Sequence, residues 1–387
     1  MTCAPFAVQR RSVAPLELFF DLVFVFAIGQ LAEHLHEELS WRGAAETAVM
    51  LVAVLSCWAL TSFDATFLDV ELPRTRWLVL AVMGLGLFMN AQVPHAFADR
   101  SWAFVVPLVA VLLLTDVTAA ATAPTAVLRR HYRRVTAWAA VSVPLWIAGA
   151  AVGSGPRLAW WAVAAAVDMI GVWLAHPLPG SVLSSRDLAF DADHMVERIR
   201  LFIILQLGET VLTIGTAISA APVDAPTVTT GLGVFVALVC LCASYFRGGE
   251  DILARHVATA ADRLLPVRHA VSGQYPTLAG LVTFAVGAEL AIGHPTGHGS
   301  ATLSLLLFGG TILYVITQAW WYYTSTGQAW GVRLLACLAC AVAAVAARWL
   351  PPLASVLILD AILVALVLAL KPVHRRVLDA MVGEGEG

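Results

Sequence analysis

The sequence predicts an all-α membrane protein, a polytopic bundle of about twelve transmembrane helices. Of its 387 residues, 60% are hydrophobic and only 13% are charged, whereas soluble domains are about 45–50% apolar and about 25% charged. The mean hydropathy is +0.82, and the apolar residues gather into runs of about 20, the length that crosses a bilayer core. These observations exclude a soluble enzyme and a disordered chain. The net charge of −3 leaves no basic surface for a nucleic acid, so we expect no nucleic-acid partner.

Each candidate span is an apolar run bounded by charged or turn-forming residues. In chain order the spans are 15–35, 43–63, 76–97, 102–122, 135–153, 158–177, 200–220, 228–246, 270–292, 301–323, 332–349 and 352–371.

The first six spans are interrupted by few ionisable residues. The first span opens at Pro15 and contains Glu17 and Asp21; its length and these acids exclude a cleavable signal peptide. Spans two, three and five are almost free of charge. The fourth contains Asp116 and the sixth contains Asp168.

The second six spans carry more polar residues. The seventh reads RLFIILQLGETVLTIGTAIS, with Glu209 near its middle. The ninth contains Tyr275-Pro276, where a proline kinks the helix and frees backbone groups. The eighth, tenth and eleventh are apolar, and the twelfth contains Asp360.

The basic residues predict the topology. When the connections between spans are assigned alternately to two sides, only Arg42, Arg100, Arg157 and Arg348 of the 23 basic residues fall on the second side. The positive-inside rule then places both termini in the cytoplasm. Lys371 is the single lysine, a bias typical of GC-rich codons, so we expect a bacterial protein of the plasma (cytoplasmic) membrane.

The chain divides into two similar parts. We predict a first six-helix half at 1–177, a cytoplasmic connecting loop at 178–199, a second six-helix half at 200–371 and a cytoplasmic tail at 372–387. LVAVLSCWALTSF in the second span resembles VALVCLCASYF in the eighth, and WAVAAAVDMIGVWLA in the sixth resembles LASVLILDAILVALV in the twelfth. Because six helices separate the matching segments, this is a parallel repeat.

The strongest site candidates are acids in the first and seventh spans. A carboxylate near a helix centre costs about 2.5–3.5 kcal/mol on insertion scales, so such groups usually face partners and mark function. Glu17 and Asp21 are four residues apart on one helix face, where they could share a cation or an arginine. The alternative for Glu17 is a role at the membrane interface, assisting the helix N-terminus.

A polar stripe follows the seventh span through Arg198, Gln206 and Glu209. We expect Gly208 to let a neighbouring backbone come close to Glu209. The stripe is predicted to line a substrate or ion pathway; the alternative is a structural hydrogen-bond seam between helices.

Further candidates for the pathway are Asp116 and Glu289, the latter at the outer end of the ninth span. His194 and Glu197 have the spacing of half a metal site, but no second half is visible, so no metal site is predicted. We find no dinucleotide-binding or phosphate-binding loop and no protease or hydrolase motif. The sequence therefore predicts no cofactor, no catalytic residues and no enzymatic activity.

Three blocks resemble the bacterial low-temperature-requirement A family of multi-pass membrane proteins. They are the run Pro15–Phe26, the set His194, Glu197, Arg198, Leu201, Phe202, Leu207, Gly208 and Glu209, and the AVGAE stretch ending at Glu289. The family pattern has a histidine shortly before the proline of the ninth span, where this chain has Gln274-Tyr275-Pro276. The resemblance implies a polytopic membrane protein and marks Tyr275 as a motif position; it supplies no substrate.

The predicted function is a proton- or cation-coupled secondary transporter of an unidentified small solute or ion, working in the lipid bilayer. Membrane-embedded carboxylates, a parallel repeat and the lack of a nucleotide motif favour it. The alternatives are an ion channel, because Phe-Phe-Asp in the first span resembles a motif of some potassium channels, and a membrane sensor or structural protein without transport. An oligomer is compatible with the sequence.

Overall fold

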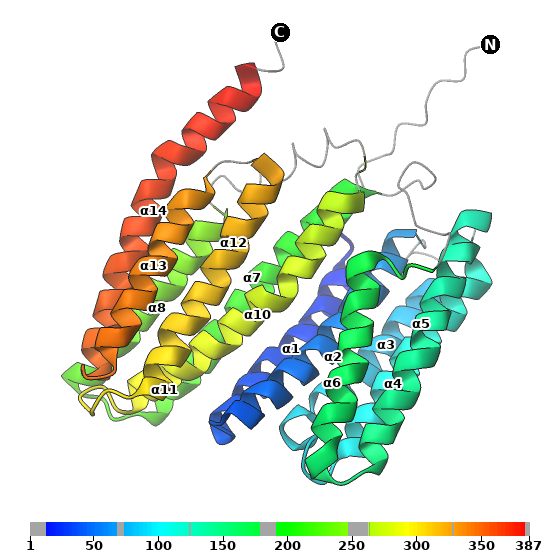
Figure 1. The fold of residues 1–387 in the computed structure, drawn as a ribbon, viewed down its shortest axis with the longest axis horizontal. Helices are drawn as coiled ribbons and strands as arrows, with labels where there is room; N and C mark the ends of the chain where they lie inside the picture. Colours follow the sequence, from blue (N-terminus) through cyan, green and yellow to red (C-terminus); the bar gives the residue numbers. More distant parts are fainter. Residues whose placement is uncertain are drawn as a thin grey trace.

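The chain folds into a bundle of long helices (Figure 1). The computed structural model describes residues 13–67, 73–123, 125–178, 191–246, 262, 264–326 and 329–383. Over these residues it contains twelve long helices, with the continuous segment Ala301–Thr326 counted as one, and no strand. Eleven of them are long and apolar enough to cross a membrane. The predicted all-α polytopic bundle is therefore confirmed.

The first half contains α1 (Pro15–Glu37), α2 (Trp41–Phe67), α3 (Pro73–Asn90), the short 3₁₀ helix η1 (Val93–His95), α4 (Ser101–Thr122), α5 (Ala126–Ala151) and α6 (Ser154–Leu174). The second half contains α7 (Ala192–Ala220), α8 (Ala225–Phe246), α10 (Leu264–Gly293), α11 (Ala301–Ser304), the π-helical turn η3 (Leu305–Gly309), α12 (Gly310–Thr326), α13 (Trp330–Ala347) and α14 (Pro352–Gly383).

The third span is shorter than the sequence predicted. It ends at Asn90 rather than near residue 97, because Pro94 interrupts the regular backbone hydrogen bonds and the chain continues as η1. Asn90 closes the end of α3 by donating from Nδ2 to the carbonyl of Val23, 2.8 Å away. With Arg74 and Arg76 in its first turn, α3 is the long helix, among those described, that is not apolar enough to count as a membrane span.

Several helices extend past their predicted spans, and α5, α7 and α14 extend the furthest. α5 begins at Ala126 and carries four arginines in its first turns, and α14 continues through Pro372 to Gly383. α7 begins at Ala192, so residues 192–199 of the predicted connecting loop are helical, while 179–190 lie outside the described residues. A helix can continue beyond the apolar core of a membrane, because its backbone hydrogen bonds are internal and do not depend on the surroundings. Its charged side chains then reach the water and the lipid headgroups.

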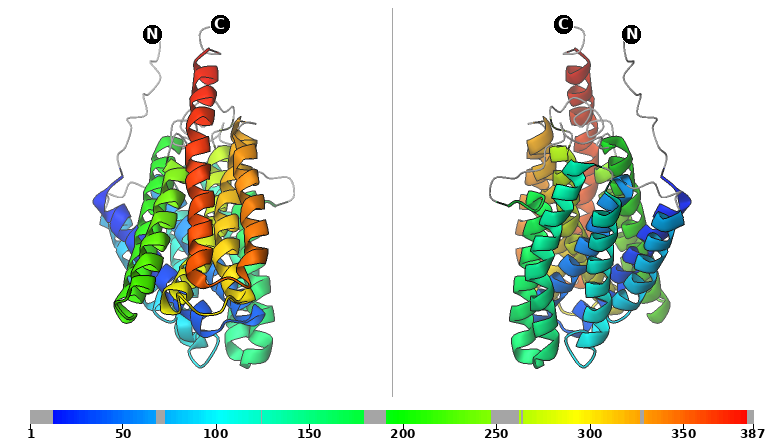
Figure 2. Two further views of the ribbon diagram at one scale, coloured as in Figure 1. Left: turned by 90° about the vertical axis from the view of Figure 1, so that its left-hand side faces the viewer. Right: turned by 90° about the vertical axis from the view of Figure 1, so that its right-hand side faces the viewer.

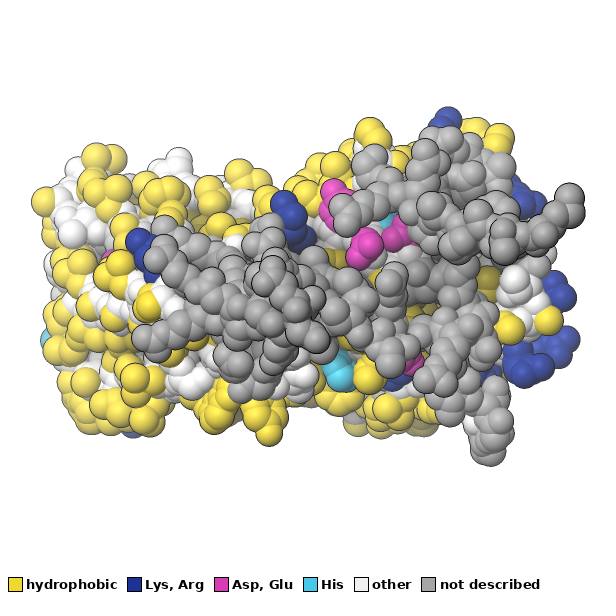
Figure 3. Space-filling model, turned by 90° about the horizontal axis from the view of Figure 1, so that it is seen from above, with side chains coloured by type: hydrophobic (Ala, Val, Ile, Leu, Met, Phe, Trp, Pro, Cys, Tyr) yellow, Lys and Arg dark blue, Asp and Glu magenta, His cyan; other side chains and the backbone are white. Residues whose placement is uncertain are grey.

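Successive helices run in opposite directions, so α1 begins and α14 ends at the same end of the bundle (Figures 1 and 2). We name this the basic end, because the residues Arg42, Arg100, Arg157 and Arg348 lie at the opposite end and the other described arginines lie here. Viewed onto the basic end, Lys and Arg side chains gather mainly at the right-hand edge, with further patches inside the outline, and hydrophobic side chains line much of the circumference (Figure 3).

The same helix pairs are in contact in the two halves. The helices correspond in chain order, with α1 to α6 matching α7, α8, α10, α12, α13 and α14. The first half has the contacts α1–α2, α1–α3, α2–α6, α3–α4, α4–α5 and α5–α6. The second half has the matching contacts α7–α8, α7–α10, α8–α14, α10–α12, α12–α13 and α13–α14. This correspondence is the pattern that a parallel repeat produces. The halves meet where α1 and α2 contact α7 and α10, and one continuous apolar core runs through both.

Candidate functional site

A buried cluster of charged side chains joins the two halves between α1 and α7. It consists of Glu17 and Asp21 from α1 and of His194 and Arg198 from α7, and we name it the α1–α7 charge cluster. The exposure of each of these side chains is 3% or less. Charged groups are almost never buried to this extent unless they are paired.

The local sequence places the four residues on facing helix surfaces. Glu17 and Asp21 are one turn apart, as are His194 and Arg198, so each pair shares one face of its helix. Pro15 opens α1, and the backbone N–H of Ala14 donates to Glu17 Oε2 at 2.9 Å. At the start of α7, Asp191 accepts from the backbone N–H of His194 at 3.0 Å. Asx and proline residues are the usual signals for such helix starts.

The two acidic residues meet the two basic ones directly. The His194 Nε2 atom lies 3.1 Å from Glu17 Oε1. An Arg198 terminal nitrogen donates to Asp21 Oδ1 at 2.7 Å, and the other lies 3.8 Å from Glu17 Oε1. One arginine therefore serves both carboxylates.

Aromatic side chains enclose the cluster. Trp58 of α2 donates from Nε1 to Asp21 Oδ1 at 2.8 Å and stacks on Phe202 of α7, with ring centroids 4.1 Å apart and planes 10° apart. The Arg198 guanidinium also lies 5.6 Å from the centre of the Phe20 ring, within the range of a cation–π contact. These rings keep bulk water from the ion pairs, which strengthens their electrostatic interactions.

The charges of the cluster balance only with one added proton. Two carboxylates against one arginine leave a net charge of −1 when His194 is neutral, and a buried net charge is costly. A proton on His194 or on one carboxyl group makes the cluster neutral. The arrangement is thus suited to holding and releasing a proton.

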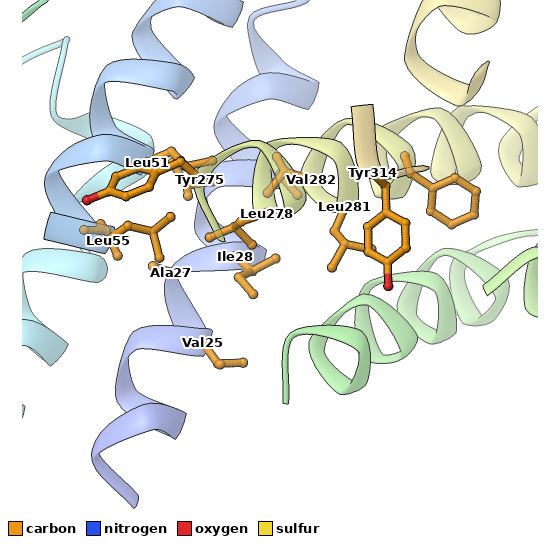
Figure 4. Packing of buried hydrophobic residues seen from close by; sticks show 14 of the residues in the cluster. Val25, Ala27, Ile28, Leu51, Leu55, Tyr275, Leu278, Leu281, Val282 and Tyr314 are labelled. Atoms are coloured by element: carbon orange, nitrogen blue, oxygen red, sulfur yellow. The ribbon is translucent and has the colours of Figure 1, made fainter. Parts of the chain in front are cut away.

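Deeper along the same interface the contacts become apolar. Ala27 and Ile28 of α1 lie close to Leu278 of α10, with Val25 one turn earlier on α1 (Figure 4). The polar contacts that remain are neutral. Gln206 Nε2 donates to Gln274 Oε1 at 3.3 Å, and the Tyr275 hydroxyl lies 3.2 Å from Ser56 Oγ.

Glu209 does not belong to the charge cluster. Its side chain is half-buried, and its Oε1 atom lies so close to Gly29 of α1 that a Cβ at Gly29 would come within 2.6 Å. Our expectation for Gly208 was wrong: this residue is exposed, and a Cβ there would meet nothing within 4 Å. The close approach of the two helices is provided by the glycine on α1 instead.

The other predicted residues lie in separate places. Asp116 is buried in the first half, away from α7. Glu289 is half-exposed at the end opposite the basic end, where His36 Nδ1 lies 3.3 Å from its carboxylate. Glu197 is exposed. Within the described part of the chain, no three His, Cys, Asp or Glu side chains form a group that could hold a metal ion.

Sequence reasoning missed two features of the site. Trp58 bridges the cluster to α2, and its signal was an indole in mid-span, whose N–H needs a partner when buried. A second polar region, lined by Asp64, His131 and His176 together with Asp116, was also missed. Asp64, His131 and His176 lie near the ends of the predicted spans. A polar residue at such a position is usually explained by the membrane interface alone.

Comparison with known proteins agrees with this architecture. The family described as bacterial low temperature requirement A protein (LtrA) matches residues 12–368. An uncharacterised protein of Rhizobium meliloti (strain 1021) is 30% identical over 321 residues, which cover 81% of this chain and 77% of that protein. No solved structure matches the chain. The match includes both helices of the charge cluster, and the chain therefore belongs to the bacterial low temperature requirement A family.

Proposed function

We propose that this protein is a proton-coupled secondary transporter of the bacterial plasma membrane, and not an enzyme, with the α1–α7 charge cluster as its coupling site. The observation that carries the proposal is the charge balance of the cluster, which needs one exchangeable proton while it is buried. Proton relays in transporters use such intramembrane Asp, Glu and His groups.

The position of the cluster links this proton to a conformational change. Its ion pairs join α1 of one half to α7 of the other, so they are made or broken when the halves move relative to each other. Alternating access in transporters with repeats is largely a rocking of one repeat against the other. The matching helix contacts of the two halves support a parallel six-plus-six repeat of this kind.

Protonation supplies the switch. A proton on Asp21 or Glu17 weakens its attraction to Arg198, and deprotonation restores it. The state with paired halves and the state with separated halves then bind the proton with different affinities, which is the condition for coupling.

The test is a flux measurement on proteoliposomes that contain a pH-sensitive dye. Small inorganic ions and metabolites are added one at a time under an imposed pH gradient, and solute-dependent proton movement is recorded. We expect Glu17→Gln and Asp21→Asn to abolish this movement, whereas Glu197→Gln, an exposed acid of the same helix region, should retain it.

Two results would contradict the proposal. Proton movement that is unchanged in both cluster variants would remove the cluster from coupling. Large unitary currents in planar bilayers would indicate the channel alternative instead.

A further inference from the structure

A second polar site lies inside the first half. Two adjoining cavities of about 20 Å³ and about 40 Å³ lie between α2, α4, α5 and α6 near the basic end, the larger one also against the start of α10, and both are lined by Asp116 and His176. Asp168 lines the first cavity, and Asp64 and His131 line the second. A buried water needs about 10–15 Å³ of such space. The cavities can therefore hold water or a small ion, and they are too small for an organic solute.

Asp116 is the acid of this site with an unpartnered carboxylate oxygen. Its exposure is 5%, and its Oδ2 atom is buried with no hydrogen-bond partner among the described residues. By contrast, Asp168 Oδ2 accepts from Trp146 Nε1 at 2.8 Å. A buried carboxylate oxygen without a donor is costly, and native structures usually satisfy it with water or an ion.

The lining is rich in acidic side chains. The titratable and charged groups that face or adjoin the cavities are Asp64, Asp116, His131, Tyr132, Arg134, Asp168, His176 and Arg268. Arg268 already donates to the carbonyl of Trp173. His176 follows the end of α6, and burial lowers its pKa to about 3, so this imidazole is neutral at pH 7. The groups around the two cavities are thus three aspartates and two arginines, so the space favours one further positive charge.

The second half has a buried arginine side chain in the corresponding place. The helices α8, α12 and α13 correspond to α2, α4 and α5, and at the same end they enclose Arg333, whose exposure is 0%. Its guanidinium lies 3.3 Å from the carbonyl of Ser244 and 3.5 Å from Gln318 Oε1, and 3.8 Å from the centre of the Tyr322 ring. In the first half this place holds the acidic cavity, and the buried Arg134 of α5 lies beside it, against His131.

We propose that the cavity of the first half binds one small monovalent cation, with Asp116, the acid that lines both cavities, as its principal ligand. The cation is an alkali-metal ion, ammonium or hydronium, and it occupies the place that Arg333 fills in the second half. This site is separate from the α1–α7 charge cluster, and its occupancy does not depend on whether the protein transports a solute.

The test measures binding to the full chain in lipid nanodiscs. Radioactive sodium and rubidium ions are added in a scintillation proximity assay, with lithium, potassium and ammonium chlorides and lowered pH as competitors. We expect saturable binding of one of these cations, its loss in Asp116→Asn, and its retention in Asp360→Asn, a half-buried aspartate on α14 of the second half.

A hydronium occupant gives a different pattern. Neither isotope then binds, but infrared spectra show a carboxylic-acid C=O band that appears with falling pH and is missing in Asp116→Asn. Absence of both isotope binding and this band would overturn the proposal, as would binding that survives Asp116→Asn.

A second variant covers the case in which Asp116→Asn does not fold. His131→Arg places a guanidinium on α5 beside the acids, as Arg333 is placed on α13. We expect this variant to lose cation binding and the pH-dependent band while it keeps or raises the melting temperature. Unchanged cation binding in a folded His131→Arg protein would contradict the proposed position of the ion.

Discussion

Asp21 of α1 accepts a 2.7 Å hydrogen bond from Arg198 of α7, and these two residues are 177 positions apart in the chain. Glu17 and His194, the other pair of the cluster, are also separated by 177 positions. The two helices therefore run parallel and meet in register.

Facing side chains at this interface would repel if both carried the same charge. Here α1 supplies acids and α7 supplies an arginine and a histidine, so the contact is attractive. These pairs add to the apolar core that joins the two halves.

Exchange of one pair tests this register. Asp21→Arg or Arg198→Asp alone places two like charges in a buried site, and breaking a buried ion pair costs about 3–5 kcal/mol. We expect each single variant to lower the melting temperature and the double variant to recover part of the loss, because the pair is re-formed with its direction reversed. Recovery should remain partial, since Trp58 donates to the Asp21 carboxylate. A double variant that is less stable than both single variants would contradict the register.

Arg198 should be irreplaceable by lysine. The two terminal nitrogens of its guanidinium group contact Glu17 and Asp21 at the same time. The single ammonium group of a lysine cannot reproduce that geometry. We expect Arg198→Ala to reduce the free energy of unfolding by about 3–5 kcal/mol and Arg198→Lys to restore only a minor part of it, as measured by SDS-induced unfolding in mixed micelles. Arg200→Ala is the control, because Arg200 is exposed two positions further along α7. Equal stability of the lysine variant and the parent would show that the second contact is unimportant.

The sequence predicted the all-α bundle and the approximate positions of its helices, because apolar runs and the arginines between them can be read along the chain. It also predicted which residues share a helix face: Glu17 with Asp21, and Arg198 with Glu209. It could not predict which helix each face meets, since that depends on contacts between segments far apart in sequence. For this reason Glu209, placed on the same stripe as Arg198, lies against Gly29 and outside the cluster.

Trp58 contributes to the cluster in two separable ways, through its hydrogen bond to Asp21 and through its stacking on Phe202. Trp58→Phe removes the hydrogen bond but retains an aromatic ring, and we expect a loss of about 1–3 kcal/mol, the cost of leaving a buried acceptor without its donor. Trp58→Leu also removes the stacked ring and should cost more. The free energies of unfolding are compared with that of Trp160→Phe, a partly exposed indole on α6. If Trp58→Phe were as stable as the parent, the indole N–H would not be part of the cluster.

Glu209 and Asp21 should differ in their access to reagents dissolved in the membrane. Glu209 is half-buried, whereas the exposure of Asp21 is 0% and it is paired with Arg198. We therefore expect a hydrophobic carbodiimide to label Glu209 and to leave Asp21 unlabelled, as read by mass spectrometry of peptides. Gly29→Ala should increase the labelling of Glu209, because the added Cβ would lie 2.6 Å from Oε1 and push the carboxyl group away from α1. Gly84→Ala is the matched control, since a Cβ there meets nothing within 4 Å. Preferential labelling of Asp21, or equal labelling of Glu209 in the two glycine variants, would contradict the packing of α7 against α1, and with it the interface on which the charge cluster depends.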